Sequence, residues 1–151
     1  MTPASRAAVI DEAEIAARLR LSATRLARRL RQEADSGFTP SQLSALATIH
    51  NSGPITLGAL ADQERVAPPS ITKVVAKLEA EGLVERTPDA IDGRVCHVST
   101  TRAGRALVEE SRRRKTTWLA GRLHELGPDA QARLAAALDV LEDILADEDR
   151  P

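Results

Sequence analysis

The chain has 151 residues, with 21 basic and 22 acidic side chains, so its formal net charge is −1 and its length suits one domain, or one domain with an arm for oligomerisation. Its single cysteine, Cys96, excludes an intramolecular disulfide framework, and its longest apolar run is too short to span a membrane. Acidic residues precede any apolar stretch at the N-terminus, which argues against a signal peptide, and we expect a globular protein of the cytoplasm.

The first predicted element is a long helix from about Ala8 to Asp35, which Gly37 ends. Apolar residues at spacings of four, seven and four form a narrow stripe along it, namely Ile15, Leu19, Leu26 and Leu30. A long helix with so narrow a stripe usually packs against a partner.

A second helix is predicted from Pro40 to about His50. Thr39 suits its N-cap, and Gln42 can complete a capping box by bonding back to the N-cap backbone. After a turn at residues 51–54, Thr56 is the N-cap candidate of a short third helix over 57–64.

A tight break at residues 65–67 leads into a fourth helix, from Pro68 to Glu81, which Gly82 ends. Its apolar residues, Ile71, Val74, Val75 and Leu78, predict one buried face. Two short strands follow, at 83–87 and 95–99, joined by a turn-forming loop over 88–94 into a hairpin.

A long helix is predicted from Thr101 to the break at residues 127–129, and a last helix follows. The last helix carries leucines with heptad spacing at 134, 138, 141 and 145, and the acidic end at residues 147–151 is expected to fray.

Charge is segregated along the chain, because residues 102–122 hold seven basic against two acidic side chains, and residues 123–151 hold two basic against eight acidic side chains. A nearly neutral protein with such segregation can still present a basic face.

A short helix, a tight turn, a second helix and a hairpin together form the pattern of a winged helix-turn-helix. The second of these helices turns small, hydroxyl and basic residues outward, and no acidic residue occurs from Arg65 to Lys77. Its first-turn N–H groups are expected to bind a phosphate. In the hairpin, Arg94 is expected at the tip, with Asp92 holding its side chain extended. These features favour binding to double-stranded DNA.

The stretch from Phe38 to Gly104 resembles the MarR family of bacterial transcription regulators. The resemblance rests on residues 55–61 (ITLGALA), 69–75 (PSITKVV), 78–86 (LEAEGLVER) and 92–94 (DGR), and on residues 99–104 (STTRAG). It implies a mainly α fold with a small β-wing, in which residues 37–100 form the DNA-binding winged helix-turn-helix. Residues 1–36 and 101–151 would then be helical dimerisation regions.

The resemblance also implies a homodimer that binds a pseudo-palindromic operator as a repressor and is released by a small lipophilic or phenolic effector. We place DNA contacts at Pro69, Ser70, Thr72, Lys73, Lys77, Arg86 and Arg94. By position in the family, Ser70, Thr72 and Lys73 would face the major groove and Arg94 the minor groove. The chain departs from the family at Ala67, where serine is common, at Gly93, where a second arginine is frequent, and at Thr100, where leucine is usual.

Two alternatives stay open: a winged helix used as a protein–protein interaction module, and a DNA-binding regulator without an effector. Trp118 is a candidate for lining an effector pocket, which should be mostly aliphatic because the chain has so few aromatic residues. The basic run at 112–115 is expected to be solvated or to pair with the acidic tail of a partner subunit. Cys96 is expected to point into the core.

No catalytic motif, metal-ligand pattern or cofactor fingerprint occurs in the sequence, so we expect no enzyme activity, metal site or cofactor.

Overall fold

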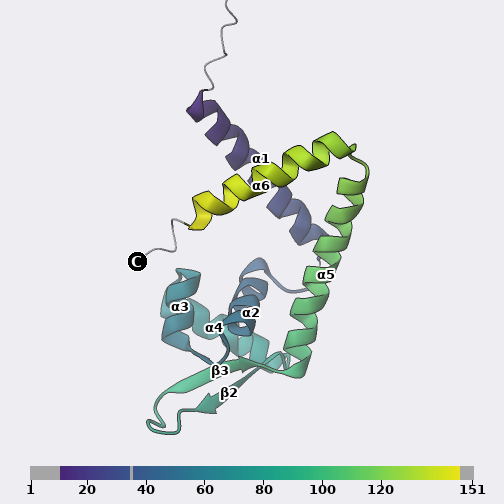
Figure 1. Cartoon of the computed structure of the whole chain (residues 1–151). Coiled ribbons are helices and arrows are strands. Elements are labelled where there is room, and N and C mark those ends of the chain that lie inside the picture. Colours follow the sequence, from purple (N-terminus) through teal and green to yellow (C-terminus); the bar gives the residue numbers. More distant parts are fainter. Residues whose placement is uncertain (1–10, 35, 147–151) are drawn as a thin grey trace, which may run out of the picture.

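The computed structural model describes residues 11–34 and 36–146. Their elements, in chain order, are α1 (Glu12–Glu33), α2 (Pro40–Ser52), β1 (Ile55–Thr56), α3 (Leu57–Glu64), α4 (Pro68–Ala80), β2 (Val84–Pro88), β3 (Cys96–Thr100), α5 (Arg102–His124) and α6 (Pro128–Ala146). Figure 1 shows a lobe made of α2, α3, α4 and the hairpin, with α1, α5 and α6 extending away from it. The mainly helical fold with a small wing is confirmed.

The predicted starts of α2 and α3 are confirmed by their capping bonds. Thr39 and Gln42 form the reciprocal capping box of α2, and the Thr56 hydroxyl accepts from the N–H of Ala59 at 3.2 Å. In α1 the N-cap is Asp11, so the helix begins later than the pattern suggested, and the predicted residues 8–10 and 35 lie outside the described part of the chain. Helix α2 runs two residues beyond His50, to Ser52, and ends at Gly53 with a φ of 69°.

The sheet has a third strand that the sequence pattern did not reveal. Strand β1 pairs antiparallel with β3, placing Ile55 opposite Val98, and the strand order is β1-β3-β2. Two residues are too few to show an alternating pattern, so β1 could not be seen in the sequence. Strand β2 begins one residue later than predicted, at Val84, because Leu83 donates its N–H to the Leu78 carbonyl as part of the helix end expected at Gly82. Strand β3 is also shifted by one residue from the prediction and covers Cys96–Thr100.

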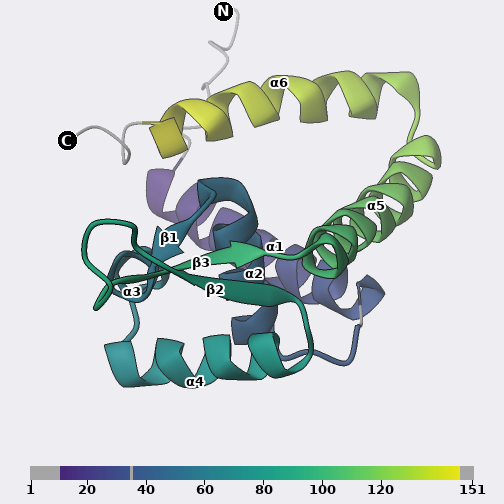
Figure 2. The same cartoon turned by 90° about the horizontal axis from the view of Figure 1, so that it is seen from below.

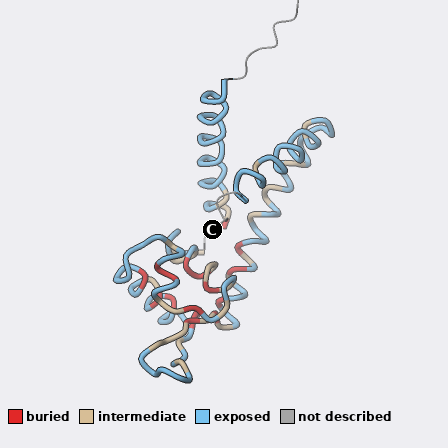
Figure 3. The backbone as a smooth tube through the Cα atoms, turned by 60° about the vertical axis from the view of Figure 1, so that its left-hand side comes forward, coloured by how far each residue is buried: buried red, intermediate tan, exposed pale blue. Residues whose placement is uncertain are grey.

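The hydrophobic core lies wholly inside the winged lobe and the base of α5. The largest fully buried side chains are Leu46, Ile49, Leu60, Val75, Leu78 and Val98. In Figure 3 most of the buried backbone lies in this region, and Ala34, at the end of α1, is also buried. Neither α1 nor α6 has a buried residue, and their apolar stripes, which include Ile15, Leu19, Leu26, Leu138 and Leu145, are exposed. No helix in the described part of the chain is long and apolar enough to cross a membrane.

Helix α5 joins the lobe to the other long helices. At its start, the Thr101 hydroxyl donates to the Gly82 carbonyl at 2.7 Å and accepts from the N–H of Gly104 at 3.1 Å. Further along, the guanidinium groups of Arg29 of α1 and of Arg122 lie over the Trp118 ring, at 5.5 and 5.6 Å from the ring centre. Figure 2 shows α6 on the far side of the molecule from α4.

Candidate nucleic-acid interface

The turn between α3 and α4 orients the second helix of the motif. Arg65 adopts the left-handed conformation with a φ of 53°, and the N–H of Val66 bonds to the Ala61 carbonyl at 3.1 Å. A left-handed non-glycine residue is sparsely populated and persists where its surroundings hold it. The turn therefore has a defined geometry that directs α4 away from α3.

Helix α4 presents the face that the sequence predicted. Ile71, Val75 and Leu78 are buried, and Val74 packs against them in a partly buried position. The opposite side is exposed and carries Pro69, Ser70, Thr72, Lys73 and Lys77. The Thr72 hydroxyl donates to the Pro68 carbonyl at 2.9 Å, which leaves its oxygen available as an acceptor.

The first turn of α4 offers no free N–H group for a phosphate, so that expectation is wrong. Positions 68 and 69 are prolines, which lack an N–H, and the N–H of Ser70 already bonds to the Ala67 carbonyl at 2.9 Å. The N–H of Ile71 bonds to the same carbonyl at 3.3 Å. Contacts to DNA at this end of the helix must come from side chains.

The three basic side chains near this face differ in their surroundings. Lys73 forms no salt bridge with any residue that the structure describes, whereas the Lys77 ammonium lies 2.9 Å from the Glu81 carboxylate. Arg86 of β2 lies 3.1 Å from the Glu79 carboxylate of α4, and its side chain is only 28% exposed. Arg86 therefore links β2 to α4, and its predicted DNA contact competes with this ion pair.

The wing loop is a hydrogen-bonded turn built on Asp89. Its carboxylate accepts from the N–H groups of Ile91 at 2.8 Å and Asp92 at 3.0 Å, and its other oxygen lies 3.0 Å from Nε2 of His97. These bonds stabilise the ionised form and lower the pKa of Asp89 to about 2, with the backbone bonds contributing most and His97 less.

Arg94 is exposed near the tip of the wing, as predicted, but Asp92 does not hold its side chain. Asp92 instead accepts from the Arg94 backbone N–H at 3.1 Å, because a side chain two residues before an N–H forms an Asx turn more readily than a long ion pair. The nearby Cys96 is half-buried, so the core is reached by Val98 and not by the cysteine.

A pocket of about 590 Å³ lies where α1, α2, α4 and α5 meet beside the helix-turn-helix. It is lined by Arg31, Ala34, Pro40, Ser41, Leu43, Ser44, Ala47, Glu64, Val66, Ser70, Ile71, Val74, Val108, Ser111, Arg112 and Lys115. Half of these residues are polar and none is aromatic, so the apolar part of the lining is aliphatic, as expected. Trp118 is not among them, and its ring instead lies under the guanidinium groups of Arg29 and Arg122.

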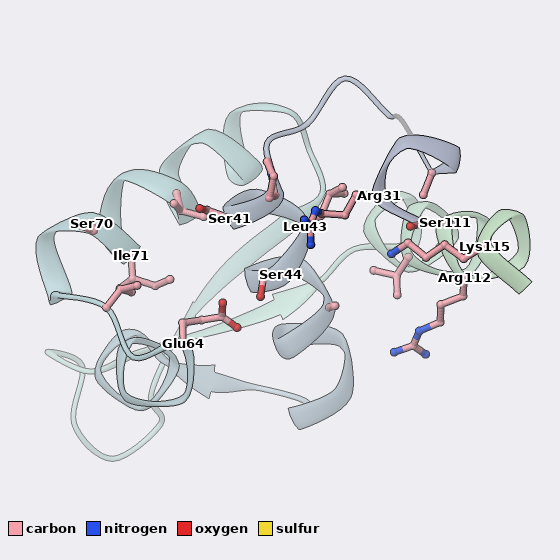
Figure 4. Close-up of a pocket in the computed structure, with 16 residues that line it drawn as sticks. Arg31, Ser41, Leu43, Ser44, Glu64, Ser70, Ile71, Ser111, Arg112 and Lys115 are labelled. Carbon is pink, nitrogen blue, oxygen red and sulfur yellow. The ribbon is translucent and has the colours of Figure 1, made fainter. Parts of the chain in front are cut away.

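The two ends of the pocket differ in the charge of the side chains that line them. In Figure 4, Arg112 and Lys115 lie at the end formed by α5, and Glu64 and Ser70 lie at the end formed by the helix-turn-helix. Arg112 donates to the Asn51 side chain at 2.6 Å, and Glu64 accepts from the Thr48 hydroxyl at 2.5 Å.

The rest of the basic run on α5 is paired within its own helix. Arg113 and Arg114 both bond to Glu110, and these bonds lower the pKa of that carboxyl. Pairing of the run with a partner's tail at 147–151 falls outside the described residues. Within the described residues no group of three or more His, Cys, Asp or Glu side chains could hold a metal ion.

Known proteins share this arrangement. The MarR family model matches residues 38–96. An HTH-type transcriptional regulator of Mycobacterium leprae is 43% identical over 136 residues, which cover 89% of this chain and 95% of the relative. A solved transcriptional regulator protein from Pseudomonas aeruginosa is 33% identical, with a TM-score of 0.79 over 87% of this chain and 94% of the other. A Staphylococcus aureus MepR variant bound to an oligodeoxyribonucleotide is 19% identical, with a TM-score of 0.69 over 87% of this chain and 97% of that chain.

Proposed function

This chain belongs to the MarR family of DNA-binding transcriptional regulators, and we propose that it acts in the cytoplasm as a homodimeric repressor of a pseudo-palindromic operator, released by a small-molecule effector. In this proposal residues 37–100 bind DNA, residues 1–36 and 101–151 hold the dimer together, and the chain has no catalytic role.

The observation that carries the DNA-binding part of the proposal is the exposed face of α4. Ser70, Thr72 and Lys73 project from one side of a helix whose other side is anchored in the core. Such a helix fits the major groove, where hydroxyl and ammonium groups bond to base edges. The unpaired Lys73 and the exposed Arg94 supply the positive charge, and the MepR variant bound to an oligodeoxyribonucleotide supports the same use of this fold.

The dimer is proposed from the apolar surface that one subunit leaves exposed. Ile15 and Leu19 of α1 and Leu138 and Leu145 of α6 are each at least one-third exposed, although their spacing is that of a packed seam. Helix α1 carries six arginines against three glutamates, whereas α6 carries four acidic residues against one arginine. The α1 of one subunit and the α6 of its partner are therefore complementary in charge as well as apolar character.

The effector is proposed to occupy the pocket beside the helix-turn-helix. Leu43, Val66 and Val74 give it apolar walls, and Arg112 and Lys115 place positive charge at one end. A small lipophilic molecule with a phenolate or carboxylate group matches this pattern. Because Ser70 and Ile71 belong to both the pocket wall and α4, a bound molecule can bias the position of that helix.

In vitro selection from a random duplex library with the full-length protein tests the function. We expect enrichment of one pseudo-palindromic sequence, whose binding weakens with salt and is abolished by the double variant Lys73→Glu and Arg94→Glu. Retention of affinity and salt dependence in that variant would refute DNA binding and favour a protein–protein module.

Sedimentation at micromolar concentration tests the dimer, and a monomer at that concentration contradicts it.

Salicylate is a suitable phenolic probe for the effector. We expect salicylate to weaken operator binding by the wild type. Lys115→Gln should reduce that effect without changing the affinity for the operator when salicylate is absent. Equal binding with and without such probes would favour a regulator that lacks an effector.

A further inference from the structure

The wing tip carries an apolar side chain that no packing accounts for. Ile91 is 98% exposed, whereas the next most exposed large hydrophobic residue in the described part of the chain, Leu145, is 61% exposed and lies on the seam assigned to the dimer. A single exposed apolar residue on a broad surface needs no explanation. Ile91 differs because it stands on a projecting loop that Figure 2 shows on the same side of the lobe as the start of α4.

The turn presents Ile91 in a defined position. Its own N–H is bonded to the Asp89 carboxylate at 2.8 Å, and the next N–H, of Asp92, bonds to the same oxygen at 3.0 Å. The loop is closed at its base by a bond from the Asp89 N–H to the Val95 carbonyl at 2.8 Å. Because the backbone is already ordered, little conformational entropy remains to be lost when the tip binds.

The electrostatics of the loop favour an apolar contact over a purely ionic one. Residues 88–95 contain two carboxylates and one guanidinium, so the tip has little net attraction for phosphates. Both carboxylates are turned into the loop, where they accept backbone N–H bonds of Ile91, Asp92 and Arg94. What the tip offers to a partner is therefore Ile91 together with Arg94.

We propose that Ile91 is a specificity-determining apolar contact to DNA, which enters the minor groove beside Arg94 and partly unstacks a base step there. The proposal rests on the proposed DNA-binding function and adds a residue and a mode of readout to it. Isoleucine is among the side chains that proteins insert between base steps in the minor groove, and flexible pyrimidine–purine steps unstack most easily. The residue then selects for a deformable step at the operator flanks without a hydrogen bond to any base.

The test uses the full-length protein and the duplex obtained by selection with the wild type. Fluorescence anisotropy measures the affinity of the wild type and of Ile91→Ala, Ile91→Leu and Ala90→Ser. We expect Ile91→Ala to bind at least about tenfold more weakly, because three buried carbons are lost from each wing. Ile91→Leu should bind within about twofold of the wild type, as should the neighbouring exposed control Ala90→Ser.

Two further readouts separate this contact from a change in charge or folding. The slope of affinity against salt should be unchanged in Ile91→Ala, because an apolar contact releases no counterions, whereas Arg94→Ala should lower it. A 2-aminopurine placed at successive steps of the operator flanks should brighten at one step with the wild type and Ile91→Leu, and at none with Ile91→Ala.

Equal affinity and equal 2-aminopurine signals for the wild type and Ile91→Ala would overturn the proposal while leaving DNA binding intact. A lowered salt slope in Ile91→Ala would also overturn it, since the residue would then act through neighbouring charges. Failure of the wild type to select any duplex would refute the proposed function itself, and the role of Ile91 with it.

Discussion

Gly104 of α5 packs directly against the backbone carbonyl of Leu83, the residue that joins α4 to β2. A Cβ at position 104 would collide with the Leu83 oxygen, which also accepts the N–H of Thr101 at 3.0 Å. This close approach holds the start of α5 against the residue between the end of α4 and the start of β2. A side chain at position 104 would therefore disturb the junction between α5 and the end of α4.

Gly104→Ala should lower the free energy of unfolding by about 3 kcal/mol, because the added methyl group meets backbone that cannot move aside. Chemical denaturation followed by circular dichroism measures the change. Gly121→Ala in the same helix is the matched control, since nothing lies within 4 Å of a Cβ there. That control should raise stability by about 0.5–1 kcal/mol, and a similar loss in both variants would contradict the role of the Leu83 contact.

Ala67→Ser should raise the stability of the protein by about 1 kcal/mol, because Ala67 provides no side-chain capping bond although its extended backbone suits an N-cap. The serine hydroxyl would share the N–H of Ser70, which already bonds to the carbonyl of residue 67. Thermal unfolding measures the gain, with Thr39→Ala as the reverse comparison, since it removes the capping box of α2 and should cost a similar amount. No gain from Ala67→Ser would show that the prolines exclude the capping geometry.

Glu81→Gln should tighten operator binding, because it releases Lys77 from its 2.9 Å ion pair and removes a negative charge beside the DNA-facing side of α4. Lys73→Gln, which removes an unpaired charge, should weaken binding and lower the salt slope by about 1 for each subunit. Lys77→Gln should have a smaller effect than Lys73→Gln. Titrations at several salt concentrations measure these slopes, and equal effects of the two lysine variants would contradict the distinction.

The wing turn should loosen in acid. The folded protein lowers the pKa of Asp89 from 3.8 to about 2, so the stabilisation it provides is present above pH about 4 and is lost as the pH falls towards 2. Amide hydrogen exchange of Ile91 and Asp92, corrected for intrinsic rates, should accelerate over that interval. In Asp89→Asn their exchange should already be faster at neutral pH and lose most of this acid dependence. Unchanged protection in the variant would refute the role of the carboxylate.

The sequence predicted the helices, their caps and the winged motif because these depend on local interactions. Thr39, Gln42 and Thr56 cap through bonds that span three residues, and α4 shows its buried face through the spacing of Ile71, Val75 and Leu78. Strand β1 was missed because its existence depends on pairing with β3, more than forty residues along the chain.

The candidate DNA-binding site was likewise predicted from the sequence only in part. The outward face of α4 followed from helical periodicity, but the pairing of Arg86 with Glu79 and the turn that Asp89 builds on its own loop became visible only in three dimensions. The expectation of free N–H groups at the start of α4 was wrong because positions 68 and 69 are prolines and the N–H groups of Ser70 and Ile71 both bond to the Ala67 carbonyl.

The sequence by itself determined the type and order of the helices and of the two hairpin strands, and the outward-facing residues of α4, since periodicity, capping and turn chemistry act within a few residues. Only the tertiary structure decided how charges pair across elements, which residues enclose the pocket, and that Gly104 must lack a side chain. Those outcomes depend on distances between residues far apart in the chain, and packing sets them once the elements have come together.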